Sequence, residues 1–341
     1  MRRRSEIGKP TGRIEQIWID SKAAADNLLG DPERRRVDVY IPAGHDGKGL
    51  PLLVDVVGFT AGGPAHTNWK NHGETVPERV DRLIASGAMK PAVIAFPDCF
   101  TRLGGNQYVN SPVMGRWEDF LTQEMLAAVE GKFGCGGVGK RGIFGKSSGG
   151  YGSIYHALKH GGTIWSAAAC HSGDMGFDLL YSLGDWGGVL RTLAKHQFDI
   201  AKFIDAFEGA VKSDDKSWHA IMFLAQAASF DPDPTSPLGV RLPVTTDTCQ
   251  LLPDRWANWL SFDPLTIVED KDAQENLKAM KCLFIDCGDI DQYNLVYGAR
   301  LLNRRLTDLN IDHRYEEFPD THSGIDYRMD ISLPLLAAAL S

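Results

Sequence analysis

The chain has 341 residues, 43% of them hydrophobic and 23% charged, and a formal net charge of −8 at pH 7. This composition is typical of a globular protein with a sizeable core and excludes a disordered or fibrous chain. The negative charge argues against nucleic acid or an anionic membrane surface as the main partner, because both are bound through clustered lysine and arginine. We expect the one basic cluster, at residues 2–4, to be a solvated tail.

The sequence predicts no targeting or membrane segment. Its N-terminus has positive charge but no apolar stretch behind it, so a signal peptide is not predicted. The sequence contains no run of about 18 apolar residues, so no transmembrane span is predicted. The six cysteines are scattered without C-x-x-C spacing, which favours reduced, buried thiols over a disulfide framework or a zinc site. We therefore expect a cytoplasmic protein without a bound metal.

The first half of the chain predicts the start of a layered α/β fold. Two runs of alternating hydrophobicity within residues 14–41 predict antiparallel strands. Continuous apolar runs at residues 50–58 and 91–98 predict strands that are buried on both faces of a parallel sheet. Residues 76–87, between these runs, predict a crossover helix, and the apolar spacing of residues 115–134 predicts a longer one.

Residues 141–160 read RGIFGKSSGGYGSIYHALKH and pass from a short apolar strand through a glycine turn into a helix. Their centre fits the G-x-S-x-G nucleophile elbow, with Ser147 in the serine position. A serine on such a strained turn needs residues without a Cβ two positions before it and two after it. Gly145 and Gly149 satisfy this requirement.

Other readings of the same turn fail. Ser148 is out of frame, because Lys146 instead of glycine stands two positions before it. A Walker A loop ending at Ser147 would need a glycine where the chain has Lys140. A second frame, residues 134–140, contains glycines and ends in Lys140. It is followed by Arg141, where a Walker A loop requires Ser or Thr. We therefore set nucleotide binding aside.

The second half of the chain contains an insertion and then resumes the βα pattern. A strand is expected at residues 165–170, and residues 175–262 form a helix-like, aromatic-rich segment. Strand and helix alternating on both sides of an insertion predict an α/β fold with a mostly parallel central sheet and helices on both faces. The core would comprise residues 1–174 and 263–341, with residues 175–262 as a largely helical cap. The later elements expected are strands at residues 280–287 and 313–318 and helices at residues 293–309 and 326–340.

A nucleophilic serine needs a base and a carboxylate that orients the base. In a hydrolase with this elbow, the chain order is Ser, then Asp or Glu, then His. His322 follows the strand at residues 313–318, and catalytic groups of open α/β sheets lie beyond the carboxyl ends of strands. We therefore favour His322 as the base. His171, which follows the strand after the elbow, is the one competitor, and we expect it to line the pocket.

Two carboxylates follow the strand at residues 280–287 and compete for the role of the acid. Asp289 and Asp291 are two residues apart in the segment GDIDQY. We favour Asp291, because the longer loop reaches towards His322. The other aspartate would then serve a turn or a helix cap.

An oxyanion hole would complete the site. One donor would be the N–H of Ser148, directly after the nucleophile, and the other an N–H from the loop after the early buried strand. That loop, at residues 57–63, reads VGFTAGG, and we choose the N–H of Phe59. A flexible surface loop would explain its glycines but not their position after this strand.

With these residues in place, the chain resembles the "Putative esterase" family of α/β-hydrolases, which includes S-formylglutathione hydrolase, the siderophore esterases and the antigen 85 mycolyltransferases. The likeness covers roughly residues 12–170 and 275–340. It rests on the segments RRVDVYIPAG, VVGFTAGG, PDCFTRLGGNQYVNS, WEDFLTQEMLAAVE, FGKSSGGYGS, CGDIDQYN and THS. The resemblance implies an α/β-hydrolase fold and these roles: Ser147 as nucleophile, His322 as base, Asp291 as acid, and the N–H groups of Phe59 and Ser148 as oxyanion donors.

The sequence thus predicts a serine-dependent hydrolase that cleaves a small-molecule carboxylic ester through an acyl-enzyme and needs no cofactor. The aromatic residues of the insertion suggest an apolar acyl or aryl group, although most of them would form the insertion's own core. Thr60, Trp69, Tyr108 and His171 are the candidate pocket residues.

Three questions stay open at this point. An acyltransferase would use the same triad, because only the acceptor, alcohol instead of water, differs. A catalytically silent binding protein is disfavoured, because all three triad residues are present. The aromatic insertion could also form the contact of a homo-oligomer.

Overall fold

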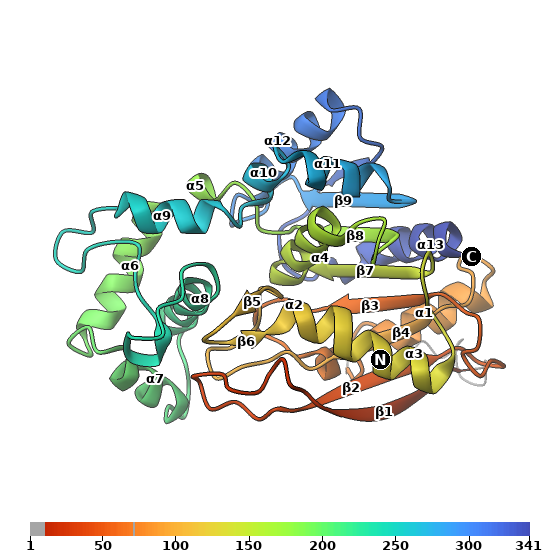
Figure 1. The fold of residues 1–341 in the computed structure, drawn as a ribbon, viewed down its shortest axis with the longest axis horizontal. Helices are drawn as coiled ribbons and strands as arrows, with labels where there is room; N and C mark the ends of the chain where they lie inside the picture. The colour runs from red at the N-terminus through yellow and green to blue at the C-terminus, as the bar shows by residue number, and fades with distance from the viewer. Residues whose placement is uncertain (1–10, 71) are drawn as a thin grey trace.

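The computed structural model describes residues 11–70 and 72–341, so the basic cluster at residues 2–4 lies outside the described residues. A central eight-stranded sheet has the strand order β1-β2-β4-β3-β7-β8-β9-β10 (Figure 1). β2 pairs antiparallel with β1 and β4, and the other neighbouring strands are parallel. This arrangement confirms the mostly parallel sheet. The strands are β1 (Arg13–Asp20), β2 (Arg34–Ile41), β3 (Leu52–Val56), β4 (Val93–Pro97), β7 (Arg141–Lys146), β8 (Ala167–His171), β9 (Cys282–Gly288) and β10 (Arg314–Phe318).

The continuous apolar runs are explained by burial on both faces of the sheet. In β3, Leu52 and Val54 belong to the hydrophobic core on one face, and Leu53 belongs to the core on the other. All three are fully buried. Successive side chains of a strand point to opposite faces, so a strand with both faces covered is mostly apolar, and a polar residue in it, such as Asp55, needs a buried partner. β1, at the edge, has exposed residues instead and shows the alternating pattern.

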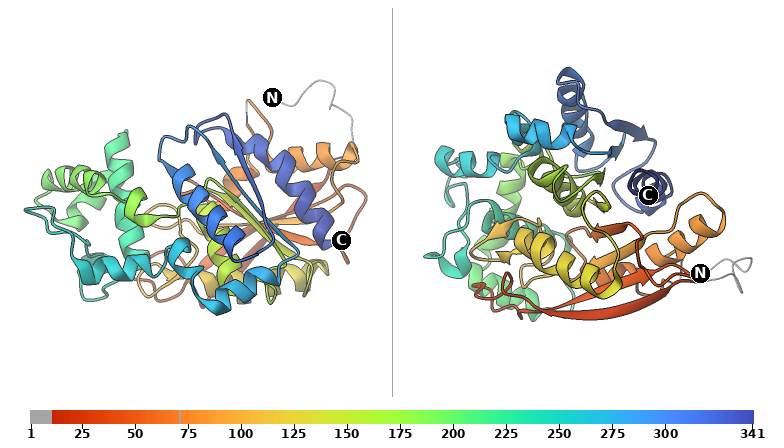
Figure 2. Two further views of the ribbon diagram at one scale, coloured as in Figure 1. Left: turned by 90° about the horizontal axis from the view of Figure 1, so that it is seen from above. Right: turned by 45° about the vertical axis from the view of Figure 1, so that its right-hand side comes forward.

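Helices cover both faces of the sheet (Figure 2). The apolar side chains of α1 and α13 pack on one face. Those of α3, α4, α11 and α12 pack on the other. The α1 helix starts with a capping box formed by Thr75 and Glu78, as its sequence favours. The helices are α1 (Val76–Ala85), α3 (Leu126–Phe133), α4 (Ser148–His160), α11 (Lys271–Lys278), α12 (Leu295–Asp308) and α13 (Met329–Leu340).

Two predicted helices have more internal structure than the sequence indicated. The helix expected at residues 115–134 begins as α2 (Trp117–Asp119), continues as the π-helical turn η3 (Phe120–Met125) and ends as α3. It follows a short hairpin of β5 (Asn110–Ser111) and β6 (Gly115–Arg116). The last helix, expected from residue 326, is preceded by a 3₁₀ turn, η5 (Ile325–Arg328). The other 3₁₀ turn near the sheet is η2 (Gly63–His66).

The insertion is largely helical and lies to one side of the sheet, at the left of Figure 1 and of the left view in Figure 2. Its aromatic residues pack mainly on one another, as Trp186 does on Phe223 and Trp259, with ring centroids 4.8 and 5.6 Å apart. It also contacts the sheet layer, because the ring of Phe230 lies 5.6 Å from that of Tyr151 on α4. The elements of this segment are α5 (Phe177–Leu180), α6 (Leu183–Ala194), α7 (Ile200–Glu208), α8 (Asp215–Phe230), η4 (Pro237–Gly239), α9 (Pro253–Leu260) and, just after it, α10 (Pro264–Ile267).

Cys99, Cys135, Cys170 and Cys287 are buried, whereas Cys249 and Cys282 are half-buried. Within the described parts of the chain, no helix has both the length and the apolar character needed to cross a membrane.

Candidate active site

Ser147 lies on a strained turn between β7 and α4. Its backbone has φ 58° and ψ −125°, a conformation that is costly for a residue with a side chain. Neighbouring backbone groups hold it there: the Ser147 N–H donates to the carbonyl of His171 at 3.0 Å, and the Tyr151 N–H donates to the Ser147 carbonyl at 2.8 Å. The strain is thus maintained by the strand and the helix that flank the turn.

The two glycines of the elbow are required by close backbone contacts with β3. A Cβ at Gly145 would lie 2.1 Å from the carbonyl oxygen of Val56, and one at Gly149 would lie 1.8 Å from the same oxygen. Neither distance is compatible with a side chain. A Cβ at Gly58 would lie 3.5 Å from that of Ser147, so the loop after β3 passes directly beside the serine.

His322 and Asp291 form a buried hydrogen-bonded pair. His322 Nδ1 lies 2.8 Å from Asp291 Oδ2, and the two residues are 8% and 5% exposed. The Tyr293 N–H donates to Asp291 Oδ1 at 2.9 Å, and the His322 N–H donates to Gln292 Oε1 at 2.9 Å. Asp289, the competing carboxylate, is exposed. The structure therefore pairs the histidine with Asp291.

The sheet places Ser147, Asp291 and His322 at one edge. They follow β7, β9 and β10, which run parallel to one another, so the three loops leave from the carboxyl ends of the strands. Ser147 is half-buried. Among the described residues, neither Ser147 Oγ nor His322 Nε2 has a hydrogen-bond partner. In serine hydrolases, the hydrogen bond between the serine and the histidine often forms only when substrate is bound.

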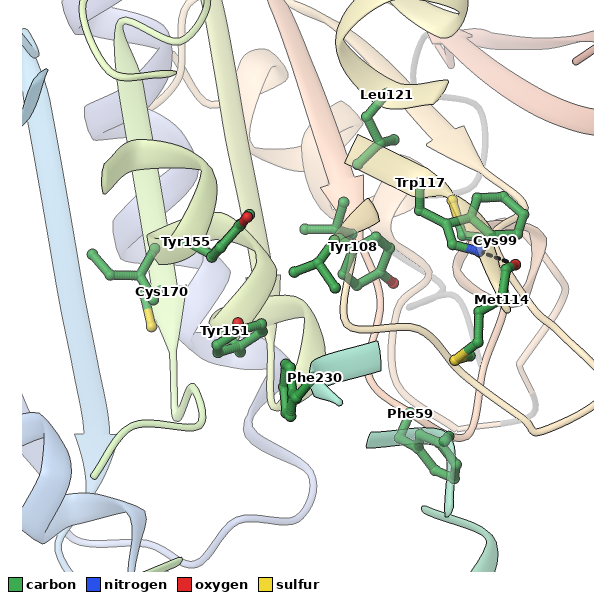
Figure 3. Close-up of a cluster of buried hydrophobic side chains, with 14 of the residues drawn as sticks. Phe59, Cys99, Tyr108, Met114, Trp117, Leu121, Tyr151, Tyr155, Cys170 and Phe230 are labelled. Atoms are coloured by element: carbon green, nitrogen blue, oxygen red, sulfur yellow. Dashed lines mark hydrogen bonds between the residues drawn. The ribbon is translucent and has the colours of Figure 1, made fainter. Parts of the chain in front are cut away.

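The loop after β3 is packed, not free. A Cβ at Gly105 would lie 2.1 Å from the Phe59 carbonyl oxygen, so the backbone at Gly105 packs directly against the backbone of Phe59. Phe59 is 6% exposed, and its ring belongs to the buried cluster shown in Figure 3. Tyr108 holds the start of the loop, because its hydroxyl donates to the Val57 carbonyl at 2.6 Å.

The far end of this loop is held by a buried ion pair. His66 Nδ1 lies 2.6 Å from Asp55 Oδ2, and Asp55 is in the fully buried strand β3. Burial lowers the pKa of His66, but the adjacent Asp55 carboxylate outweighs this effect and the pKa is raised. Both ends of the loop that carries Phe59 are therefore fixed to the sheet.

Ser148 has the position expected of an oxyanion donor. It is the first residue of α4, and N–H groups in the first turn of a helix have no partner within the helix. Its side chain is engaged elsewhere, because Ser148 Oγ accepts a hydrogen bond from Gln107 Nε2 at 2.9 Å.

Residues 32–262, well over half of the chain, match the model of the "Putative esterase" family. The chain belongs to this family. It is therefore a carboxylic ester hydrolase, as its sequence predicted. No curated protein sequence matches the chain.

Solved structures of esterases have the same fold. A ferulic acid esterase is 19% identical with a TM-score of 0.63, over 97% of this chain and 99% of the other. An S-formylglutathione hydrolase from Agrobacterium tumefaciens is 16% identical with a TM-score of 0.60, over 97% and 96% of the two chains. FphF, a fluorophosphonate-binding serine hydrolase of Staphylococcus aureus, is 16% identical with a TM-score of 0.57, over 96% and 99%. These likenesses show the α/β-hydrolase fold.

The pocket residues expected for this esterase lie in different surroundings. Trp69 is 82% exposed, and Thr60 is exposed in the loop after β3. Tyr108 is 2% exposed, and its hydroxyl is already engaged by the loop. His171 is 2% exposed, and its two ring nitrogens lie 2.7 Å from Asp286 Oδ1 and 2.8 Å from Ser332 Oγ on α13. The expectation that His171 lines the pocket is corrected: it belongs to a buried polar network under α13.

Two charged residues in the loops around Ser147, Asp291 and His322 were missed by the sequence reasoning. Asp174 follows β8 and is 7% exposed. Burial raises its pKa to about 6; Asp291 acts in the same direction, whereas His322 and a hydrogen bond from a tyrosine oppose it. Burial also lowers the pKa of Lys146, against the attraction of Asp326 and Asp291. Asp174 could have been found from its position in the loop after a predicted strand.

Proposed function

We propose that this esterase cleaves its ester through a Ser147-His322-Asp291 triad and an acyl-enzyme intermediate. One observation carries the proposal: the elbow presents Ser147 at the same sheet edge as the hydrogen-bonded pair of His322 and Asp291. The chain order of the three residues is also that of the α/β-hydrolases.

The first chemical step follows from the His322 contact. With its Nδ1–H donating to Asp291, the imidazole keeps a lone pair on Nε2. Nε2 takes the proton of Ser147 Oγ while Oγ bonds to the carbonyl carbon of the ester. Asp291 does not take up the proton; its charge stabilises the imidazolium that forms.

The N–H groups of Phe59 and Ser148 would donate to the oxyanion of the tetrahedral intermediate. Each such donor contributes about 2.7–4 kcal/mol to the stabilisation of the transition state. The bond between the carbonyl carbon and the alcohol oxygen then breaks, and the alcohol leaves with the proton from His322. Water, deprotonated by His322, attacks the acyl-enzyme and releases the acid and free Ser147.

The surroundings of His322 favour an ester with an apolar or aryl group. The ring of Tyr293 lies edge-on to His322, with centroids 5.0 Å apart and planes at 88°. Tyr293 is 49% exposed, and Ile290, three residues before it in the same loop, is 65% exposed. An exposed aromatic side chain beside the base, with an exposed aliphatic one in its loop, offers an apolar surface to a bound ester. One structural neighbour is a ferulic acid esterase, which agrees with an aryl acyl group.

Steady-state turnover of p-nitrophenyl esters tests this function. Wild type should hydrolyse alkanoyl and aryl esters, and Ser147→Ala should lose all but about 10⁻⁴ or less of the kcat. Ser148→Ala is the matched control: it should retain most of the activity, because Ser148 contributes its backbone N–H. Equal activity of Ser147→Ala and wild type would contradict the triad. Repeating the assay with added alcohols and analysing the products measures acyl transfer against hydrolysis.

A further inference from the structure

A carboxyl group without a role in the proposed mechanism lies at the end of the sheet that carries the proposed triad. Asp174 is in the loop after β8, the strand between β7 and β9, which lead to Ser147 and Asp291. This loop packs on the first turn of α4: a Cβ at Gly173 would lie 2.7 Å from the carbonyl carbon of Gly150. Asp174 is thus held at the same sheet edge as the nucleophile.

A directed chain of hydrogen bonds fixes one oxygen of this carboxyl. Gln226 Nε2, on α8, donates to the Tyr181 hydroxyl at 2.9 Å, so the hydroxyl proton is free to be donated to Asp174 Oδ2 at 3.0 Å. All three residues are buried. The second oxygen, Oδ1, accepts no hydrogen bond from any residue that the structure describes. The helical insertion thus sets the orientation of a carboxyl group that belongs to the sheet edge.

The charge of Asp174 is coupled to the triad. Burial raises its pKa to about 6, the negative charge of Asp291 acts in the same direction, and His322 and the Tyr181 hydroxyl lower it. Asp174 is therefore mostly ionised above pH 6, at a place where a buried charge is unfavourable without donors. A buried carboxylate with one donor has room for another, and the bound ester can supply it.

We propose that Asp174 is a specificity-determining residue, whose carboxyl group binds a hydroxyl or ammonium group of the bound ester. The proposal rests on the esterase function proposed above and narrows its substrate class to esters that carry a hydrogen-bond donor on an otherwise apolar group. A site with a buried polar group discriminates strongly against the analogue that leaves this group unpaired.

Three series of p-nitrophenyl esters test the proposal, with straight acyl chains of about four to eight atoms that end in CH₃, OH or NH₃⁺. The three end groups are nearly equal in size. At one chain length, wild type should prefer the OH and NH₃⁺ esters to the CH₃ ester by about tenfold or more in kcat/KM, the effect of one hydrogen bond to a charged group. Asp174→Asn should reduce the preference for the NH₃⁺ ester by a similar factor and keep part of the preference for the OH ester.

The pH dependence of this preference distinguishes recognition of the ester by Asp174 from a purely structural role of Asp174. In wild type, the ratio of kcat/KM for the NH₃⁺ and CH₃ esters should rise as the pH rises through about 6 and Asp174 ionises. The ionisation of His322 and Asp291 cancels in this ratio, because both esters use the same triad. Tyr181→Phe removes the donor to Oδ2, so the same rise should move to higher pH.

Two results would overturn the proposal. In one, wild type shows no preference among the three end groups at any chain length. In the other, the variants lower kcat/KM for all three esters by the same factor. If wild type turns over no ester at all, the proposed function fails instead, so the two failures are distinguishable.

Discussion

A methyl group added at Gly149 would push the elbow and β3 apart. The new Cβ would lie 1.8 Å from the carbonyl oxygen of Val56, 2.6 Å from its carbonyl carbon and 2.9 Å from the carbonyl oxygen of Val57. All three are backbone atoms, so no side chain can rotate away. The α4 helix, β3 or both must shift by a large part of an ångström or more.

The structure sets the size of the effect. Overpacking of a core costs about 1–3 kcal/mol, and we expect Gly149→Ala to destabilise the fold by about 3 kcal/mol, because only the backbone can relieve the clash. Val56 ends β3, and the next loop carries Phe59, so the same shift would move the proposed oxyanion donor Phe59 away from Ser147. A misplacement of about 1 Å costs roughly 10²-fold in rate.

Gly131→Ala is the matched control. Gly131 is exposed in α3, and a Cβ there would meet no atom within 4 Å. This variant should gain about 0.5–1 kcal/mol, because glycine weakens a helix, and should keep the wild-type activity. Denaturant unfolding and kcat/KM for a p-nitrophenyl ester measure both variants. If Gly149→Ala is as stable and active as wild type, the contacts deduced for the elbow are wrong.

Three further predictions concern the strain, the acid and the oxyanion loop. Ser147→Gly should be more stable to denaturant than Ser147→Ala by about 1–3 kcal/mol, because glycine relieves the positive φ; equal stabilities would mean that the elbow stores no strain. Asp291→Asn should lower kcat by about 10⁴-fold and Asp289→Asn by less than about threefold, and a reversed order would reassign the acid. The raised pKa of His66 beside Asp55 stabilises the fold fully below the unfolded value of 6.5, and this contribution is lost as the pH rises through the folded pKa. The difference in unfolding free energy between wild type and His66→Gln should therefore narrow from pH 6 to pH 9, and a constant difference would contradict the ion pair.

The strained turn that carries Ser147 was predictable because the signal is local. The glycines that the elbow requires stand two positions on either side of the serine, and the contacts of Gly145 and Gly149 with Val56 explain why. The choice of Asp291 over Asp289 needed the loop geometry, since the sequence places both after the same strand. In the structure, Asp291 is the one that is buried and hydrogen-bonded to His322.

The prediction that His171 lines the pocket used only its position at the end of β8. It did not take into account to which face of the sheet the side chain points. Ala167 and Ala169 belong to the core under α13, and side chains two residues apart point to the same face. His171 therefore points to the α13 face, opposite Asp286 in the neighbouring strand. The alternation of side chains along a strand would have predicted this orientation of His171 from the sequence.

The surroundings of Asp174 could not be predicted in the same way. Its hydrogen-bond partner Tyr181 follows α5, and the next member of the chain, Gln226, lies on α8 about fifty residues further along the sequence than Asp174. The contact depends on how the insertion packs against the sheet layer. No local period or spacing in the sequence encodes that packing.

Intact-mass spectrometry after treatment with a small fluorophosphonate tests the central claim most directly. Wild type and Ser148→Ala should each gain the mass of one phosphonyl group, because the reagent reacts with a serine activated by an adjacent base. Ser147→Ala should gain none. An adduct on Ser147→Ala, or none on folded wild type, would contradict the assignment of Ser147 as the nucleophile.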